Sequence, residues 1–313
     1  MGSPCELVLQ SPDAARLAAA ARAAESEVLR LEAKYSRYRD DSVTAAINRS
    51  AGSPDGLVVD DETAALLDYA DVAHRESGGR FDISSGVLRR AWDFRSGQLP
   101  SQVQIDALLP LVGWARLRWQ RPTLVLPRPG MELDFGGYVK EYAADAAANQ
   151  CRLLGVTQGY VELGGDVRIV GPQADGRPWR VGIRDPRRPE QALAVVGLSA
   201  GGIATSGDYE RFMIVDGRRY SHLLDPRTGW PVQAYASVSV MAPQALVAGT
   251  ASTTAMLLGA PEGEKWLDSL GLPGLIVDSL GGITELGRRD SGHSTIEMLR
   301  QPAPCFISFT FAQ

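Results

Sequence analysis

Residues 220–232 have the sequence YSHLLDPRTGWPV, which combines turn-forming residues with a histidine. His222 stands three residues before Asp225, which begins an Asp-Pro-Arg-Thr-Gly run. Asp-Pro and Thr-Gly favour turns, so one interpretation is a β-hairpin in which the histidine is incidental. The other is that the turn presents His222 and Asp225 to a bound substrate. The sequence contains only three histidines, so the surrounding segments are needed to choose.

The stretch lies near the end of a dense run of short strand-like segments, between about residues 155 and 241. Helical patterns precede and interrupt that run: a long Ala- and Leu-rich helix capped by Ser11, a second over about residues 61–76, and a third after the glycines at 136–137. This arrangement predicts an α+β fold with mixed or antiparallel sheets and flanking helices. No repeat or low-complexity linker is visible, so we expect a single domain over residues 1–313, built of two interleaved lobes.

Composition excludes several classes of protein. Hydrophobic residues make up 44% of the chain, enough for a sizeable core, and 37 acidic residues outnumber 32 basic ones. No Lys/Arg run forms a basic stripe, so we expect no nucleic-acid partner. No segment approaches the roughly 20 unbroken apolar residues of a membrane span. The N-terminus lacks the pattern of a signal peptide, which predicts a cytoplasmic protein as the sequence stands, or a periplasmic one if an export signal was removed.

Gly136 and Gly137 have a context that suits an anion. The preceding segment, MELDF, is strand-like, and the segment after them is a helix with Lys140 in its first turn. Backbone N–H groups at a glycine-rich helix start favour a phosphate, which a lysine there can also reach. A ligand-free strand–helix turn would use glycine too, so both interpretations stay open. The chain has no GxGxxG, P-loop, GxSxG or HExxH motif, which argues against the corresponding nucleotide-binding, hydrolase and zinc-protease sites.

Six segments, taken in order, carry a more specific signal. They are YSRYRDDSVTAAIN (35–48), GGRFDISSGVLRRAWDF (78–94), LDFGGYVKEYAAD (133–145), YVELGGDVRIVG (160–171), ATSGDYERF (204–212) and YSHLLDPRTGWPV. Together they resemble the ApbE-like FAD:protein FMN transferases, which move FMN from FAD onto a threonine or serine hydroxyl of an acceptor protein. The match covers nearly the whole chain, and the last two segments are the most specific. The resemblance implies that FAD lies in a cleft between the two lobes.

The resemblance also implies roles for individual residues. Transfer of FMN breaks the diphosphate of FAD, and a base near the acceptor hydroxyl would help it attack phosphorus. His222 suits that role because histidine titrates near neutral pH, with Asp225 orienting it or acting as the base itself. Residues that match flavin- or phosphate-contacting positions of the family are Met1, Tyr38, Arg80, Phe81, Asp82, Asp134, Lys140, Thr205, Ser206, Gly207, Tyr209 and Leu224.

The sequence departs from the family pattern where magnesium is expected. The backbone carbonyl of Gly137 and the hydroxyl of Thr253 match metal-facing positions, but Gly249 stands where the family usually has an aspartate. Glu141 likewise replaces a glycine. A hard cation needs oxygen ligands, above all carboxylates, so we expect a weakened Mg²⁺ site unless Asp134 or the substrate diphosphate compensates. K⁺ or Ca²⁺ in place of Mg²⁺ also stays open.

Three functions therefore remain after the sequence alone. The first is metal-assisted transfer of FMN from FAD to a protein hydroxyl, with release of AMP. The second is a member of the family that binds FAD but has lost the metal and the activity, as the glycine at position 249 would favour. The third is a FAD pyrophosphatase that gives the phosphoryl group to water and releases FMN and AMP.

Overall fold

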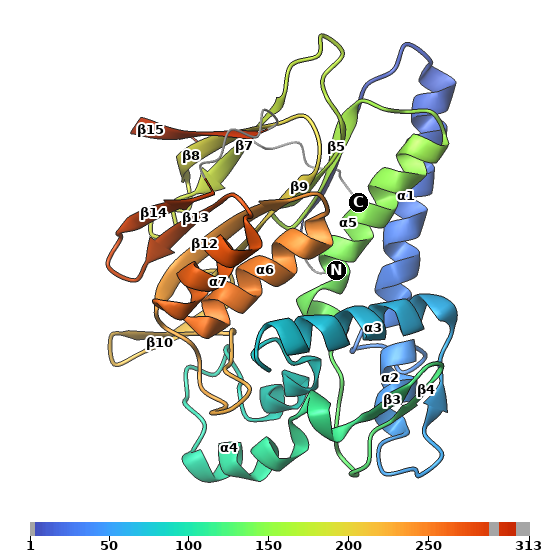
Figure 1. Ribbon diagram of the computed structural model, residues 1–313, viewed down its shortest axis with the longest axis vertical. Coiled ribbons are helices and arrows are strands. Elements are labelled where there is room, and N and C mark those ends of the chain that lie inside the picture. The colour runs from blue at the N-terminus through green and yellow to red at the C-terminus, as the bar shows by residue number, and fades with distance from the viewer. Residues whose placement is uncertain (1–3, 288–293, 305–313) are drawn as a thin grey trace.

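The structure is a computed structural model that describes residues 4–287 and 294–304. Its centre is a seven-stranded sheet in the order β1-β5-β6-β9-β12-β13-β14 (Figure 1). All neighbouring strands in this sheet run antiparallel. The strands are β1 (Cys5–Leu9), β5 (Gly159–Leu163), β6 (Asp166–Gly171), β9 (Gly202–Gly207), β12 (Tyr235–Ala242), β13 (Gly274–Asp278) and β14 (Ile283–Leu286).

Three smaller antiparallel units surround this sheet. One has the order β15-β8-β7, one is the β10–β11 hairpin, and one has the order β2-β4-β3. Their strands are β2 (Leu57–Val58), β3 (Arg118–Gln120), β4 (Thr123–Val125), β7 (Trp179–Arg184), β8 (Gln191–Leu198), β10 (Phe212–Val215), β11 (Arg218–Ser221) and β15 (Ser294–Pro304). The α+β fold class is confirmed, and every strand pair in the described residues is antiparallel.

Helices flank the sheets and connect them. α1 and α5 lie side by side, α6 packs on β9 and β12, and α3 crosses below them in the view of Figure 1. Within the described ranges, no helix combines the length and apolar character needed to cross a bilayer. The helices are α1 (Ala14–Tyr35), α2 (Val43–Arg49), α3 (Asp61–Glu76), α4 (Gln102–Leu108), α5 (Val139–Leu153), α6 (Ala245–Leu258) and α7 (Glu262–Leu270), with 3₁₀ turns at Ile83–Arg90, Leu109–Leu111, Trp114–Arg116 and Phe135–Gly137.

Most predicted elements are present, with local differences. α3 has the predicted limits, but α1 is capped by Asp13, which accepts a hydrogen bond from the Arg16 N–H at 3.0 Å, and not by Ser11. The MELDF segment is not a strand, because its backbone pairs with a side chain: the Leu133 N–H donates to Asn48 Oδ1 at 2.7 Å. The sequence of residues 305–312, CFISFTFA, also predicts a strand, but it lies outside the described residues. The division into two lobes stays a prediction.

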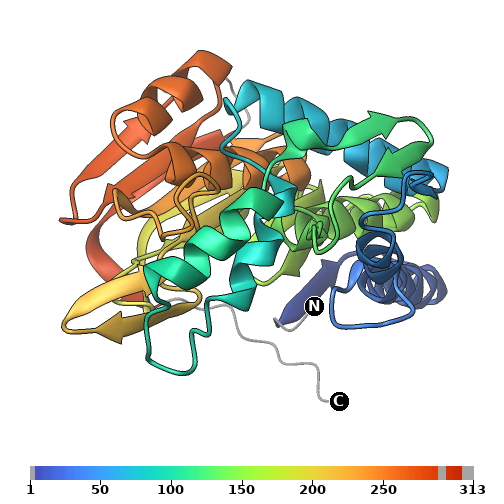
Figure 2. The same ribbon diagram turned by 90° about the horizontal axis from the view of Figure 1, so that it is seen from below.

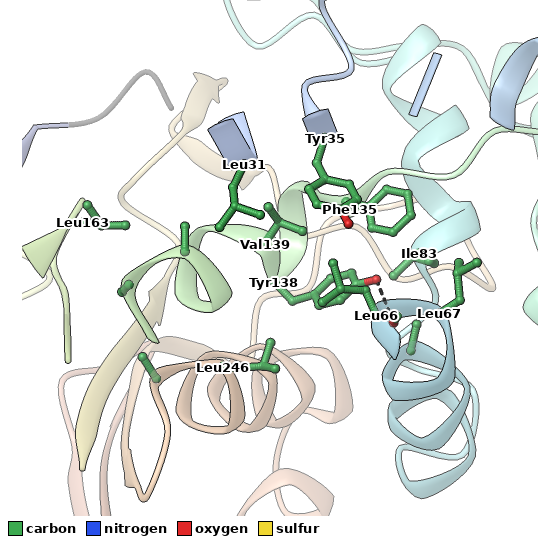
Figure 3. Close-up of a cluster of buried hydrophobic side chains, with 14 of the residues drawn as sticks. Leu31, Tyr35, Leu66, Leu67, Ile83, Phe135, Tyr138, Val139, Leu163 and Leu246 are labelled. Atoms are coloured by element: carbon green, nitrogen blue, oxygen red, sulfur yellow. Dashed lines mark hydrogen bonds between the residues drawn. The ribbon is translucent and has the colours of Figure 1, made fainter. Parts of the chain in front are cut away.

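Tyr138 lies between the Phe135–Gly137 turn and α5, and its side chain packs in the largest buried part of the core. Its side chain is fully buried, and its hydroxyl donates to the Leu66 carbonyl of α3 at 3.1 Å (Figure 3). Its ring lies 6.0 Å from those of Phe135, Phe81 and Tyr69. These contacts hold the start of α5 against α3.

The β10–β11 hairpin packs in an apolar cluster that does not include Tyr138. Met213 and Tyr220 of the hairpin pack with Val87, Leu88 and Trp92 in a separate apolar cluster. In Figure 2 the hairpin, in yellow, lies beside the segment that contains the Ile83–Arg90 turn and α4. The two apolar clusters therefore fix segments that are far apart in sequence around one region of the molecule.

Loss of the Tyr138 ring should destabilise the fold. Tyr138→Ala removes a buried aromatic side chain and should lower the free energy of unfolding by about 3–5 kcal/mol. Tyr138→Phe removes only one hydrogen bond and should cost about 1 kcal/mol. Urea denaturation followed by circular dichroism measures both, with Tyr38→Ala as a control because Tyr38 is 77% exposed. Equal stability of the alanine variant and the unaltered protein would contradict this account.

Candidate functional site

A cleft of about 480 Å³ opens where the end of α1, the start of α5, the ends of β9 and β11 and one face of α6 meet. Each of the six sequence segments that carry the family resemblance contributes residues to its wall. Of the predicted site residues, those on its wall are Tyr38, Arg80, Phe81, Asp82, Asp134, Gly137, Lys140, Thr205, Ser206, Gly207, His222, Leu224 and Thr253. A concave site with few polar groups of defined orientation is the usual form of a small-molecule site.

His222 is held as a neutral imidazole with one defined tautomer. It follows β11, and its backbone N–H donates to the Arg211 carbonyl at 2.9 Å. Its ring Nδ1 lies 3.2 Å from the same carbonyl. Because a carbonyl only accepts, Nδ1 must carry the proton, which leaves Nε2 with a free lone pair. Burial and the positive charges of Arg89, Arg211 and Lys140 lower the pKa of His222 to about 4.

Asp225 does not line the cleft. Both of its oxygens accept hydrogen bonds from the Arg227 guanidinium, at 3.1 and 2.8 Å, and Oδ1 also accepts from the Arg227 backbone N–H at 2.9 Å. Burial raises the pKa of Asp225, but the bonds from Arg227 outweigh it and the net pKa is below its ordinary value. Residues 220–232 therefore fit parts of both interpretations, since Asp225 organises the turn and His222 lines the cleft.

Lys140 meets two acidic side chains at the inner end of the cleft. Its Nζ lies 2.5 Å from Asp166 Oδ2 and 3.8 Å from Glu141 Oε1. Burial lowers the pKa of Lys140, but these two carboxylates outweigh burial and place its pKa above the ordinary value. Lys140 is therefore a fixed positive charge at neutral pH. It follows Gly136 and Gly137 along the chain, but the Gly136 N–H already donates to Asp134 and is not open to a phosphate.

Asp134 holds two arginines at the cleft that the sequence did not reveal. Its Oδ2 lies 3.0 Å from Arg37 Nη1 and 3.2 Å from Arg89 Nη1, while its Oδ1 accepts from the Gly136 N–H at 2.8 Å. Arg211 also lines the cleft. Arginine recognises phosphates well because of its planar, permanently charged head. The three arginines come from separate segments, and no spacing in the sequence connects them.

Other residues predicted to lie in the site differ in their exposure and in the groups that they contact. Tyr38 is exposed at the rim, with the Arg37 guanidinium 5.0 Å from its ring centre. Asp82 accepts from the N–H groups of Ser84 and Trp114, so it shapes the turn as well as the wall. Tyr209 is not on the wall but lies under Gly207, where a Cβ would come within 2.4 Å of its ring. Met1 lies outside the described residues.

The predicted metal positions lie beside this inner end. Thr253 Oγ1 is 2.8 Å from Ser206 Oγ, and Gly137 lines the cleft nearby. Within residues 4–287 and 294–304, no three His, Cys, Asp or Glu side chains are close enough to hold a metal by themselves. Mg²⁺ is commonly held by one or two carboxylates with water and substrate phosphates. Glu141 and Asp166, with the Thr253 hydroxyl, fit a site of that kind.

The antiparallel α+β scaffold carries a cleft in which arginines, a lysine and a histidine face acidic side chains, a form typical of a small-molecule site. Comparison with known sequences narrows this class. The chain belongs to the ApbE family, whose profile matches residues 1–276.

Curated relatives include proteins named FAD:protein FMN transferase. That of Escherichia coli K12 is 34% identical over 243 residues, covering 74% of this chain and 68% of its own length. That of Treponema pallidum is 33% identical over 282 residues, covering 83% and 77%. Among solved structures, the ApbE protein of Thermotoga maritima superposes with a TM-score of 0.84 at 32% identity, over 91% of this chain and 94% of its own. The flavin transferase ApbE of Vibrio cholerae gives 0.79 at 27% identity, over 91% and 93%.

The environment of His222 predicts an unusual titration. In the ligand-free protein, the His222 ring should stay neutral at pH 7 with its proton on Nδ1, and should become charged only near pH 4. ¹⁵N NMR of the imidazole nitrogens measures both the tautomer and the midpoint, and the His222→Gln variant assigns the signal. A midpoint near 6.5, or a proton on Nε2, would show that the Arg211 carbonyl and the surrounding cations do not control this ring.

Proposed function

We propose that this chain is a FAD:protein FMN transferase. The observation that carries the proposal is the meeting of a neutral, oriented His222 with Lys140 and several arginines in one cleft. The names of the curated relatives support it. The substrates are FAD and an acceptor protein with a threonine or serine hydroxyl, and the products are the flavinylated acceptor and AMP. A cytoplasmic or periplasmic location stays a prediction.

The reaction is a substitution at the FMN-side phosphorus of FAD. The acceptor hydroxyl oxygen forms a new P–O bond, and the bond from that phosphorus to the bridging oxygen breaks. The bridging oxygen leaves with AMP, and the hydroxyl proton is removed by a base. His222 Nε2 suits this role because the ring is neutral at neutral pH, its Nδ1 faces the Arg211 carbonyl, and the residue lines the cleft. Asp225 keeps the turn that carries His222, and its engagement with Arg227 leaves it poorly suited to act as the base.

Positive charge in the cleft suits the diphosphate. Lys140 and the arginines held by Asp134 would oppose the negative charge that builds on the bridging oxygen. A bound Mg²⁺ ion would neutralise further charge on the diphosphate. We propose that the residues near it are Thr253, with the Gly137 carbonyl and a carboxylate from the Lys140 cluster. The loss of an aspartate at position 249 is therefore not, in this proposal, a loss of all acidic ligands.

The proposal is tested with purified protein, FAD, Mg²⁺ and an acceptor protein produced without flavin. We expect AMP and, on a denaturing gel, flavin fluorescence on the acceptor, with none on a variant whose target threonine is changed to alanine. His222→Gln should lower the rate at least 100-fold with little change in FAD affinity. AMP together with free FMN would identify a pyrophosphatase instead, and tight FAD binding without AMP would identify a binding protein.

Lys140 should contribute to FAD affinity through its charge. Lys140→Gln removes a cation from the diphosphate region and should raise the Kd for FAD about 10- to 100-fold, equivalent to about 1.4–2.8 kcal/mol. Titration of the quenching of flavin fluorescence measures the Kd. Lys265→Gln is the matched control, since Lys265 is an exposed lysine of α7 that does not line the cleft. An unchanged Kd for the Lys140 variant would remove this residue from the binding site.

A further inference from the structure

Two departures from the family pattern, far apart in sequence, are in contact in the structure. Gly249 lies on α6, one turn before Thr253, and Glu141 lies in the first turn of α5. A Cβ placed on Gly249 would lie 2.6 Å from Glu141 Cγ, 2.9 Å from its Cδ and 3.0 Å from its Oε1. The Glu141 side chain therefore fills the space that a side chain at position 249 would enter.

The Glu141 carboxyl group is buried and incompletely bonded. The residue is only 7% exposed, yet it lines the inner end of the cleft. Its Oε2 has no hydrogen-bond partner among the described residues. A buried carboxylate oxygen without a partner is costly, so such a group is usually completed by a water, a ligand or an ion. The open side of this oxygen marks a place for one.

The charges around Glu141 favour a cation. Asp166, whose side chain is 3% exposed, places a second carboxylate against the same Lys140 ammonium group. Glu141 and Asp166 together carry two negative charges when ionised, against one positive charge on Lys140. The hydroxyl of Thr253 adds a neutral oxygen one turn along α6 from Gly249. Carboxylates and a hydroxyl are the ligands that a hard divalent cation prefers.

We infer that the metal-binding carboxylate of this site has moved from α6 to α5: Glu141 is the acidic ligand of a divalent cation, in the place an aspartate at position 249 would serve. This inference rests on the proposed function in one respect: it takes this cleft to be the site where FAD and the metal bind. It explains both departures together, because a glycine at 249 is needed to admit the Glu141 side chain. It also predicts that Gly249→Asp alone would not strengthen metal binding, because the new side chain would collide with Glu141.

Mn²⁺ binding tests the inference without turnover. Electron paramagnetic resonance of free Mn²⁺, with FAD present and no acceptor, gives the Kd for the metal, and FAD with Mn²⁺ but no protein gives the blank. Glu141→Gln keeps the shape of the side chain and should weaken Mn²⁺ binding at least tenfold. Glu141→Gly with Gly249→Asp should restore binding to within about threefold of the unaltered protein. Gly249→Asp alone should bind Mn²⁺ at least tenfold more weakly.

Controls separate the metal site from folding and from catalysis. Glu25→Gln removes an exposed carboxylate of α1 and should leave the Kd unchanged, and circular dichroism confirms that each variant is folded. Unchanged Mn²⁺ binding in Glu141→Gln, or a folded double variant that binds Mn²⁺ no better than Glu141→Gln, would overturn the inference. If the unaltered protein binds Mn²⁺ through Glu141 but flavinylates no acceptor, the proposed function fails and the metal site stands.

Discussion

The burial of Tyr138 is the constraint on which the site depends. Its ring is enclosed by other aromatic rings, and its hydroxyl satisfies a carbonyl of α3, so the first turn of α5 has one position relative to α3. Asp134 lies four residues before Tyr138 and Lys140 two residues after it. Fixing Tyr138 therefore fixes both the carboxylate that holds Arg37 and Arg89 and the lysine at the inner end of the cleft. Apolar packing on one side of this segment therefore fixes the positions of the charged side chains on the other side.

The charged side chains of the cleft are held in place by ion pairs with groups of opposite charge. Asp134 holds arginines on one wall, and Asp166 holds Lys140 on another. The pKa of His222 falls mainly because its ring is buried, and the positive charges of Arg89, Arg211 and Lys140 lower it further. The same field would favour an anionic diphosphate and would keep the imidazole neutral until substrate binds. In the proposed function, the same cations that help to keep His222 neutral would also bind the diphosphate.

The sequence predicted the elements whose signals are local. α3 has the predicted limits because Asp60 caps it and the chain then reaches Ser77-Gly78-Gly79. The strand predicted over MELDF was wrong because Met131 and Leu133 do alternate inward, as in a strand, while the backbone pairs with the Asn48 side chain. Alternation reports burial and does not report the hydrogen-bond partner. The arginines of the cleft could not be predicted, since only the tertiary fold brings their segments together.

The pair formed by Glu141 and Gly249 shows the same limit in another form. In the sequence these are two unrelated departures separated by more than a hundred residues, and the glycine on its own indicates a damaged metal site. In the structure they share one volume, since the Glu141 side chain of α5 fills the space that a side chain on Gly249 of α6 would enter. An oxygen ligand is defined by where its atom lies and not by the helix that carries it. A missing ligand in a sequence motif therefore indicates lost function only when no neighbouring side chain reaches the same space.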